Sequence, residues 1–352
     1  MHTRPSATSP GVSDTDVVVS ILLPTFNRAR FLPEAFDAIA AQRYRDWELI
    51  VVDDGSTDDT EALVQAFRSK SDRPVKYIKR PNGGAYAARN TGLDHAAGTY
   101  IAYYDSDDLW LPHHLERCVS ALVAHPEIDW VYGACRAVDT ATGSVLQPST
   151  FRPNGRPQPF LELRTRTVDG DLRMFDDPGT LDCQLTSGLY CGLQNSVLHR
   201  RLFASDRFWE EYKVVDDVLF VVRRLAEGAR LAYFDDVHVI YRVHQENSSA
   251  SATGASAERL LPVFQEQVRG MERVKREVAL PAGARRALDR RLAHLYFWHL
   301  GYAGYWPRGD REEALKAFSA ALRLTPGDLR MWKTYVPRLL AARLRKGRDA
   351  RA

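Results

Sequence analysis

The side chains best suited to chemistry in this sequence lie in the segment Tyr103–Trp110, which reads YYDSDDLW. Asp105, Asp107 and Asp108 fall within four positions, directly after the apolar run Thr99–Tyr104. A strand that ends in clustered acids delivers them to the carboxyl edge of a sheet, where open α/β folds bind ligands. Like charges at this spacing repel one another, and a divalent ion that also binds phosphate oxygens would neutralise them. A solvated Asp/Ser turn before a helix is the alternative interpretation of the segment by itself.

Two further polar clusters follow apolar runs earlier in the chain. The first run ends in PTFNR at residues 24–28, where backbone groups and the Thr and Asn side chains can bind a nucleobase or a phosphate. The second run ends in DDGSTD at residues 53–58, where an acid can accept a hydrogen bond from a base or from ribose hydroxyls. An ordinary turn and a helix cap are the alternatives for these two clusters.

A glycine-containing segment, NGGAYAARN at residues 82–90, precedes a helical pattern. Its glycines let the backbone approach a ligand, and the N-terminus of the following helix favours an anion. Arg89 and Asn90 lie one turn later, where they could fix a diphosphate or the acidic loops. The chain has no GKS/T motif and no GxGxxG after its first predicted strand, which counts against P-loop NTPases and nicotinamide dehydrogenases.

The elements that must position these residues alternate in the first 135 residues. Short β-branched or aromatic runs predict strands at Val17–Leu23, Trp47–Val52, Val75–Lys79, Thr99–Tyr104 and Ile128–Tyr132. Helical patterns between them cover roughly Pro33–Gln42, Asp58–Ser69, Ala85–Ala97 and Pro112–His125. This alternation predicts an α/β fold with a mostly parallel sheet and helices on both faces.

The second half of the chain is less regular. Residues 140–190 are rich in Pro, Gly, Asp and Arg, which predicts a binding insert, and we expect it to shape an acceptor site. Arg230–Val243 again has the pattern of a strand. The remaining helical patterns are Leu260–Val278, Gly283–Tyr302, Arg311–Leu322 and Leu329–Leu344. We therefore expect a catalytic domain at 17–250 and a helical region at 257–352, after a disordered tail at 1–16.

The overall composition limits the classes of protein that are compatible with the sequence. With 45% hydrophobic and 26% charged residues, it is typical of a soluble globular protein. The sequence has no run of 18 apolar residues, and its first 16 residues lack the apolar core of a secretory signal. The four cysteines show no CxxC spacing, which favours buried or free thiols in a reducing cytoplasm over disulfides or a zinc site. Of the net charge of +3, residues 330–352 hold +7 and the rest of the chain −4, which argues against a nucleic-acid-binding core.

The segments PTFNR, ELIVVDDGSTDDT and RPNGGAYAARNTGLDHAAGTYIAYYDSDD, in that order, closely resemble family 2 glycosyltransferases with the GT-A fold. The resemblance covers about residues 17–125 and resumes at 194–247. It implies an enzyme that moves a sugar from a nucleotide-diphosphate donor, with a UDP-type donor favoured, to a hydroxyl of a saccharide, a lipid-linked glycan or a small natural-product acceptor. It also implies Mg²⁺ or Mn²⁺ as cofactor.

The resemblance assigns roles to individual residues. Asp107 would be the metal ligand, with Asp108 in support, and His244 would be a further metal ligand or a diphosphate contact. A purely structural histidine is the alternative for His244, because imidazole serves many roles. The residues implied to bind the nucleotide sugar are Pro24, Thr25, Asn27, Arg28, Asp54, Asn82, Gly83, Arg89, Asp105 and Ser106.

Glycosyl transfer also needs a base that removes the proton of the acceptor hydroxyl. The segment VVDDVLF at residues 214–220 lies where the family carries an acidic pair that opens a helix. Asp217 matches the family's base, and Asp216 replaces the more common Glu. Acids that favour the dipole of a helix N-terminus are the alternative. The resemblance, together with one obvious base, implies an inverting reaction.

The C-terminal helices have separate interpretations. Asp310–Pro326 looks like the second helix of a tetratricopeptide-type hairpin, but a single unit predicts a helical cap on the catalytic domain and not a binding array. The last helix places Trp332, Val336 and Leu339/Leu340 on one side among its basic residues. This pattern predicts either a peripheral contact with an anionic membrane or a solvated basic face.

We therefore expect a cytoplasmic enzyme, which could be peripheral on the inner face of the membrane. A non-catalytic nucleotide-sugar or glycan-binding scaffold is one alternative, although such a protein would be expected to lose the acids that this chain retains. A sugar nucleotidyltransferase is a second alternative, and it would be expected to carry a basic, Gly-rich loop after the first strand.

Overall fold

The computed structural model describes residues 19–244 and 257–349. The predicted N-terminal tail at 1–16 and the end of the predicted catalytic domain, 245–250, lie outside the described residues.

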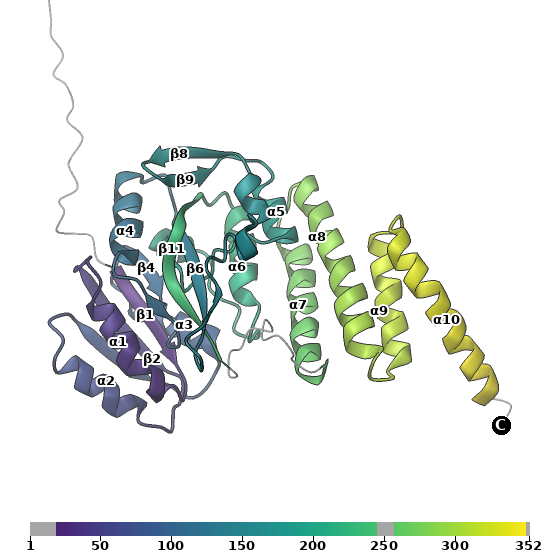
Figure 1. Ribbon diagram of the computed structural model, residues 1–352, viewed down its shortest axis with the longest axis horizontal. Helices are drawn as coiled ribbons and strands as arrows, with labels where there is room; N and C mark the ends of the chain where they lie inside the picture. Colours follow the sequence, from purple (N-terminus) through teal and green to yellow (C-terminus); the bar gives the residue numbers. More distant parts are fainter. Residues whose placement is uncertain (1–18, 245–256, 350–352) are drawn as a thin grey trace, which may run out of the picture.

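The first part of the chain forms the parallel half of a sheet (Figure 1). Its strands are β1 (Val19–Thr25), β2 (Trp47–Asp53), β3 (Val75–Lys79) and β4 (Tyr100–Tyr103), in the spatial order β3-β2-β1-β4. The short 3₁₀ helix η1 (Ala29–Phe31) and the helices α1 (Leu32–Ala40), α2 (Thr60–Arg68), α3 (Ala85–His95) and α4 (His114–Ala124) alternate with them. The predicted α/β alternation is therefore confirmed for these strands and α-helices, whose ends differ from the predicted ones by at most two residues.

The second part of the sheet mixes strand directions. Strand β10 (Ser196–His199) runs antiparallel between β4 and β6 (Trp130–Asp139), and β11 (Leu231–Val243) pairs in parallel with β6. Strands β9 (Leu172–Phe175) and β8 (Thr165–Asp169) close the far edge, while β5 (Leu109–Trp110) pairs with β11 and β7 (Val145–Gln147) with β6. The sheet is thus mixed and mostly parallel, as expected. The sequence pattern did not reveal β10, because four residues are too few to show a period.

Two apolar cores cover the two faces of the sheet. Successive side chains of a strand point to opposite faces, and accordingly Ile21 and Leu23 of β1 lie in one core and Leu22 in the other. The first core contains side chains from α1, α2 and α4. The second contains side chains from α3, from α5 (Thr180–Thr186) and from α6 (Asp216–Ala226). Helices therefore cover both faces and leave the strand ends for the site.

The predicted insert at 140–190 is more ordered than its sequence pattern indicates. It holds β7, β8 and β9, two short 3₁₀ helices at Pro153–Gly155 and Pro159–Glu162, and α5. Phe151 and Phe160 anchor it, since both are 0% exposed and both pack edge-on against Tyr233 of β11. Single aromatic anchors of this kind carry no periodicity, so the sequence pattern predicts no helix or strand in this segment.

The C-terminal region is helical, as predicted, and packs against the α/β fold. Helices α7 (Ala257–Glu277) and α8 (Ala282–His294) pack against α6 and α5 and share the second core. A π-helical segment at Leu295–Tyr305 continues α8 into the turn before α9 (Arg311–Leu324), and α10 (Leu329–Asp349) follows. Figure 1 shows α9 and α10 extending away from the sheet.

The outer surface of α10 is partly apolar. Trp332, Val336 and Leu340 are 38–55% exposed, and basic residues stand between them in the sequence. Contact of this surface with an anionic membrane stays a prediction. Across the part of the chain that the structure describes, no helix is both long enough and apolar enough to span a bilayer.

Candidate active site

Four strands deliver their carboxyl ends to one edge of the sheet. Strands β1, β2 and β4 are mutually parallel, and β10 is antiparallel both to β4 and to β6. Because β11 is parallel to β6, it also runs in the direction of β4. The polar segments that follow β1, β2, β4 and β11 therefore meet at this edge, where open α/β sheets bind ligands.

The predicted metal ligands lie next to each other at this edge. The antiparallel pairs Trp110–Val239 and Leu109–Ile240 bring β5 beside the last residues of β11. Beyond these pairs, Nε2 of His244 lies 3.0 Å from Oδ2 of Asp107. A carboxylate oxygen and an imidazole nitrogen at this separation, from segments that lie 137 positions apart, can bind the same cation.

Asp108, by contrast, points into the protein. It is 2% exposed, and its Oδ1 accepts the backbone N–H of Arg242 at 3.0 Å. The guanidinium of Arg242 in turn donates to the backbone carbonyl of Asp107 and pairs with Glu34. Burial and the repulsion of Asp107 and Asp105 raise the pKa of the Asp108 carboxyl well above its usual range. This placement fits the supporting role expected for Asp108. Its hydrogen bond to Arg242 joins the acidic loop, Asp105–Asp108, to β11.

Asp105 is held by a buried cation. Nη2 of Arg89, on α3, donates to Oδ1 of Asp105 at 2.8 Å. Burial raises the pKa of Asp105, and the charge of Arg89 opposes that rise. Ser106, the next residue, is buried. Arg89 therefore compensates part of the negative charge that collects at the strand ends.

The loop predicted to contact the donor phosphates is fastened by Asp54. Its carboxylate accepts the backbone N–H groups of Gly83 at 3.0 Å and Gly84 at 2.7 Å. It also forms an ion pair with Arg80 at 3.3 Å. Asn82 and Gly83 remain exposed at the edge. Asp54 thus positions the loop that enters α3, in addition to any contact that it makes with a base.

The loops after β1 and β2 are tied together. Asn27 adopts a left-handed conformation with φ of 52°, which its short polar side chain tolerates, and its Oδ1 accepts the backbone N–H of Thr57 at 2.9 Å. The backbone N–H of Asn27 donates to Oγ of Ser56 at 2.9 Å. Thr25 is 4% exposed, and no described residue is bonded to its Oγ1. Half-buried Pro24 and Arg28 flank this pair of loops.

Asp217, the predicted base, is oriented by Tyr86. The tyrosine hydroxyl lies 3.1 Å from Oδ1 of Asp217 and also accepts the backbone N–H of Asp217 at 3.2 Å. Burial, followed by the charge of Asp217, raises the pKa of Tyr86 well above its usual range, so the hydroxyl keeps its proton and donates it to the carboxylate. Tyr86 and Arg89 stand three residues apart on α3, and such residues share a helix face. The helix therefore links Asp217 to Asp105.

Asp216 has a different environment from its neighbour. It is 0% exposed, pairs with Nη1 of Arg223 at 2.8 Å and accepts the backbone N–H of Trp209 at 2.7 Å. Burial raises its pKa to about 6, against the opposing effect of Arg223. Asp216 is not among the residues that line the cavity described next. Its contacts stabilise the start of α6 and do not present it to a substrate.

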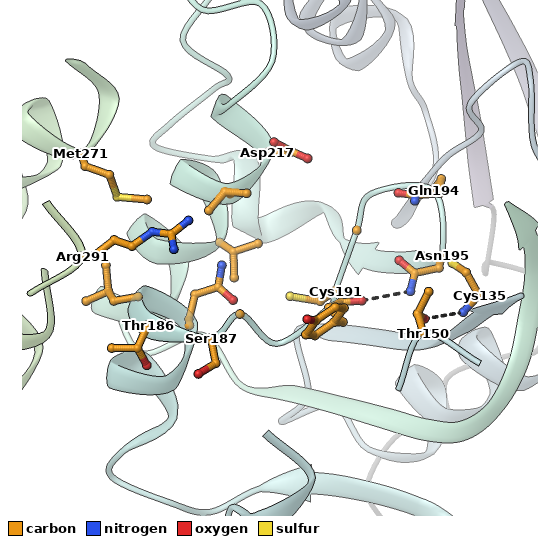
Figure 2. A pocket seen from close by; sticks show the side chains of 17 residues that line it. Cys135, Thr150, Thr186, Ser187, Cys191, Gln194, Asn195, Asp217, Met271 and Arg291 are labelled. Carbon is orange, nitrogen blue, oxygen red and sulfur yellow. Dashed lines mark hydrogen bonds between the residues drawn. The ribbon is translucent and has the colours of Figure 1, made fainter. Parts of the chain in front are cut away.

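A cavity of about 350 Å³ opens beside Asp217 (Figure 2). Its walls come from four parts of the chain: β6 with the insert, α5 with the loop that follows it, α6, and the C-terminal helices. The last part contributes Met271 from α7 and Arg291 from α8. The C-terminal region, predicted to be a cap, therefore forms part of the site.

Sequence reasoning missed two residues of the site and the cavity wall from α8. Tyr86 lies inside the NGGAYAARN segment. An aromatic residue in the first turn of the helix predicted after that loop was the sequence signal that could have identified it. Arg242 lies two positions before His244 in YRVHQENSS. Arg291 gave no signal, because only the packing of α8 against α5 brings it to the cavity.

The matching family model is "Glycosyl transferase family 2", over residues 20–180. This chain carries a family 2 glycosyltransferase domain. The chain is 28% identical over 68% of its length to an uncharacterized glycosyltransferase of Nostoc sp., of which it covers 69%. It is also 37% identical over 40% of its length to the Escherichia coli enzyme UDP-Glc:alpha-D-GlcNAc-diphosphoundecaprenol beta-1,3-glucosyltransferase WfgD, of which it covers 54%.

Two solved structures share the GT-A fold over most of the glycosyltransferase chain. Staphylococcus aureus TarS in complex with UDP-GlcNAc has a TM-score of 0.58 at 19% identity, covering 88% of this chain and 82% of TarS. The mannosyltransferase PcManGT from Pyrobaculum calidifontis, in complex with GDP-Man and Mn²⁺, has a TM-score of 0.56 at 22% identity. The coverage for that pair is 94% of this chain and 87% of PcManGT.

Removal of the Tyr86 hydroxyl tests the orientation of Asp217. In Tyr86→Phe we expect sugar transfer to fall about 10- to 100-fold, since a hydrogen bond to a charged group contributes about 1.5–3 kcal/mol. Donor binding should change little. Initial rates and donor affinity, measured side by side, check this.

Tyr100→Phe is the matched control, because Tyr100 is also a buried tyrosine and stands on β4. Equal rate losses in Tyr86→Phe and Tyr100→Phe would show that the effect comes from general loss of packing and not from the bond to Asp217.

Proposed function

We propose that this protein is a metal-dependent, inverting glycosyltransferase that uses a UDP-type nucleotide sugar and acts on a hydroxyl of a saccharide, lipid-linked or small-molecule acceptor. The observation that carries the proposal is the double contact made by α3. Through Tyr86 this helix holds Asp217 beside the cavity, and through Arg89 it holds Asp105 at the strand ends. Donor and acceptor groups would then meet across one helix.

Asp107 and His244 fit a divalent cation. Their facing atoms, 3.0 Å apart, are an oxygen and a nitrogen, the donors that Mn²⁺ accepts readily, and both side chains are half-buried at the sheet edge. The burial of several carboxylates in this loop also favours a neutralising cation. When bound, the ion would stabilise the charge that develops on the diphosphate leaving group. The presence of Mn²⁺ and GDP-Man in the mannosyltransferase structure supports this part of the proposal.

The donor nucleotide would occupy the loops after β1 and β2. Thr25 offers a buried hydroxyl, and the Asn27–Thr57 bond fixes the shape of the two loops. The loop at Asn82–Gly84, fastened by Asp54, would face the phosphates at the N-terminus of α3. UDP-GlcNAc in the TarS structure and UDP-Glc in the name of the E. coli relative favour a uridine donor.

Asp217 would act as the general base. Its carboxylate is half-buried, lines the cavity and is oriented by the hydroxyl of Tyr86. An acceptor hydroxyl in the cavity would transfer its proton to this carboxylate while its oxygen attacks the anomeric carbon. A single base that acts opposite the leaving group inverts that carbon, which anomer analysis of the product would reveal.

Metal-dependent donor binding tests the donor half of the site. Mn²⁺ and a UDP-sugar together should raise the melting temperature, because a ligand at 100 times its Kd stabilises the fold by about 2.7 kcal/mol. In Asp107→Asn we expect the Mn²⁺-dependent part of this shift to disappear. Asp37→Asn, which changes an exposed acid on α1, is the control and should keep the full shift. A full shift in Asp107→Asn would contradict the assignment of the metal ligand.

The two neighbouring acids of α6 should respond differently to the same substitution. Asp217→Asn should lower sugar transfer by about 100- to 10,000-fold, the usual contribution of a general base, with donor binding retained. Asp216→Asn should chiefly lower the melting temperature, because it disrupts a buried ion pair with Arg223. Transfer by Asp217→Asn at the wild-type rate, with a productive acceptor, would refute its role as base.

A further inference from the structure

The cavity beside Asp217 contains a positive charge that no other part of the proposed reaction uses. Arg291 reaches toward the cavity from α8, whereas Asp217 belongs to a different wall (Figure 2). Threonine and serine hydroxyls at Thr186 and Ser187, from α5 and the residue that follows it, lie on the same lining. The two charged groups of the cavity are therefore carried by α6 and α8, two helices that lie far apart in the sequence.

The guanidinium of Arg291 has no acidic partner among the side chains that the structure describes. Burial lowers its pKa, yet an arginine remains charged at neutral pH. Withdrawing a charge from water without a counter-charge is unfavourable. An anionic group in the cavity would relieve this cost and would form charge-assisted, bidentate hydrogen bonds with the guanidinium.

We propose that the cavity binds an acceptor that carries a phosphate or carboxylate, with this anionic group on Arg291 and the reacting hydroxyl near Asp217. The proposal rests on the proposed function, since it assigns the acceptor side of that site. It narrows the acceptor class to anionic molecules, because the two ends of the cavity have opposite charge. The Asp217 end accepts a neutral hydroxyl, and the Arg291 end accepts the anion.

Binding of simple anions to the full-length protein tests this assignment. The probes are phenyl phosphate and glucuronic acid, titrated calorimetrically with EDTA present so that no metal takes part. The wild type should bind at least one probe, and Arg291→Gln should weaken that binding tenfold or more. Arg291→Lys should retain part of the affinity, because it keeps the charge but loses the bidentate geometry. The probe that binds more tightly distinguishes a phosphate from a carboxylate.

Arg286→Gln is the control, because Arg286 lies on the same helix and is exposed. It should bind like the wild type. Failure of both probes to bind the wild type at millimolar concentration, or equal binding by wild type and Arg291→Gln, would overturn the proposal. Mn²⁺-dependent binding of a UDP-sugar is measured on the wild type and on all Arg291 and Arg286 variants. The proposed function predicts that each of them binds the donor. Donor binding without binding of either anion would therefore contradict only the assignment of Arg291.

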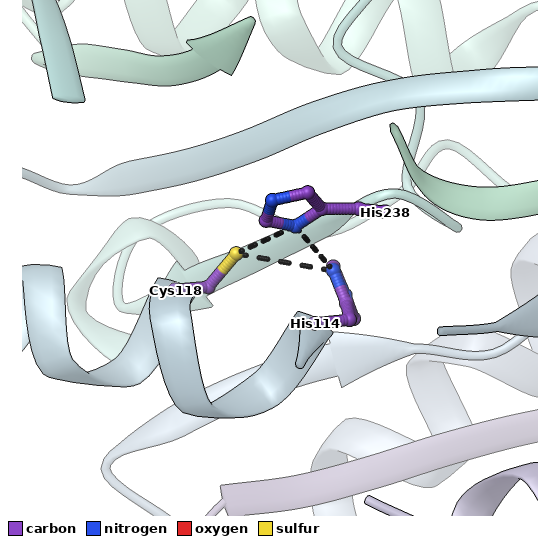
Figure 3. Close-up of side chains that lie close together, drawn as sticks. All are labelled: His114, Cys118 and His238. Carbon is purple, nitrogen blue, oxygen red and sulfur yellow. Dashed lines mark hydrogen bonds between the residues drawn. The ribbon is translucent and has the colours of Figure 1, made fainter. Parts of the chain in front are cut away.

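A second, independent inference concerns a histidine and cysteine cluster in the other core, under β11 and α4 (Figure 3). Nδ1 of His114 lies 3.1 Å from Nδ1 of His238, and Sγ of Cys118 lies 3.9 and 3.7 Å from these two nitrogens. All three residues are 0% exposed. Their three ligand atoms therefore form a small triangle inside the protein.

The dimensions of this triangle match a metal site. Tetrahedral ligands with bonds of roughly 2.0 Å to nitrogen and 2.3 Å to sulfur lie about 3.3 Å apart for two nitrogens and about 3.5 Å for nitrogen and sulfur. The other side of the His238 ring faces Oδ1 of Asp236 at 3.2 Å from Nε2, the arrangement that orients metal-bound histidines. Gly133 provides the space for that ring, since a Cβ there would lie 2.3 Å from Cγ of His238.

We infer that His114, Cys118 and His238 bind one thiophilic metal ion, zinc or cuprous copper. The ion would replace the thiol proton of Cys118, which passes to solvent, and would join α4 to β11. Helix α4 begins at His114, shortly after the segment that carries Asp107, and β11 ends at Val243, directly before His244. The site would therefore have a structural role, separate from the divalent ion at Asp107.

Metal content of the full-length protein, measured by mass spectrometry after an EDTA wash, tests this second inference. The wild type should retain one zinc or copper ion per chain, and cobalt substitution should produce a thiolate-to-cobalt absorption band. Cys118→Ser should lose the band and most of the metal. Cys135→Ser, which changes a buried cysteine of β6 that contributes no ligand to the cluster, should retain both. Absence of both metal and cobalt band from the wild type would show that the three residues form only a hydrogen-bonded pair with a packed thiol.

Discussion

The concentration of carboxylates at one edge of the sheet is the constraint on which the rest of the structure depends. Asp105, Asp107 and Asp108 follow a buried strand, and Asp217 lies close enough to Asp105 to raise its pKa further. Each needs a partner to remain in a folded protein. Arg89 supplies one for Asp105, and the backbone N–H of Arg242 supplies one for Asp108. The proposed divalent ion would supply the partner for Asp107.

Two elements make this arrangement of charges into a site. Strand β11 runs beside both β5 and β6, so its last residues stand against the acidic loop. Helix α3 carries Tyr86 and Arg89 on one face and connects the acidic loop with the first turn of α6. The side proposed for the donor and the side proposed for the acceptor are therefore joined through the packing of α3, and substitution of Tyr86 would act on Asp217 without removing a carboxylate.

The C-terminal helices extend the site beyond the family domain. Helices α7 and α8 share an apolar core with α5 and α6, and this packing fixes Met271 and Arg291 in the cavity wall. The family model ends at residue 180, whereas the cavity draws on residues up to 291. In this proposal, recognition of the acceptor depends on a part of the chain outside the family match, while the loops proposed to bind the donor lie inside it.

The sequence by itself determined the α/β class, most strands and helices, and the order of the acidic motifs, because period and turn chemistry are local properties. It also predicted that Asp107 and His244 belong to one site, through the family resemblance. The family resemblance selected Asp217 as the base, but the two residue types alone do not separate Asp216 from Asp217. Adjacent residues on a helix point in different directions, and only packing decides which one faces Arg223. Nor could the sequence place Arg291 in the same cavity as Asp217, or His114 beside His238. Those contacts join residues far apart in the chain, and only the tertiary structure brings them together.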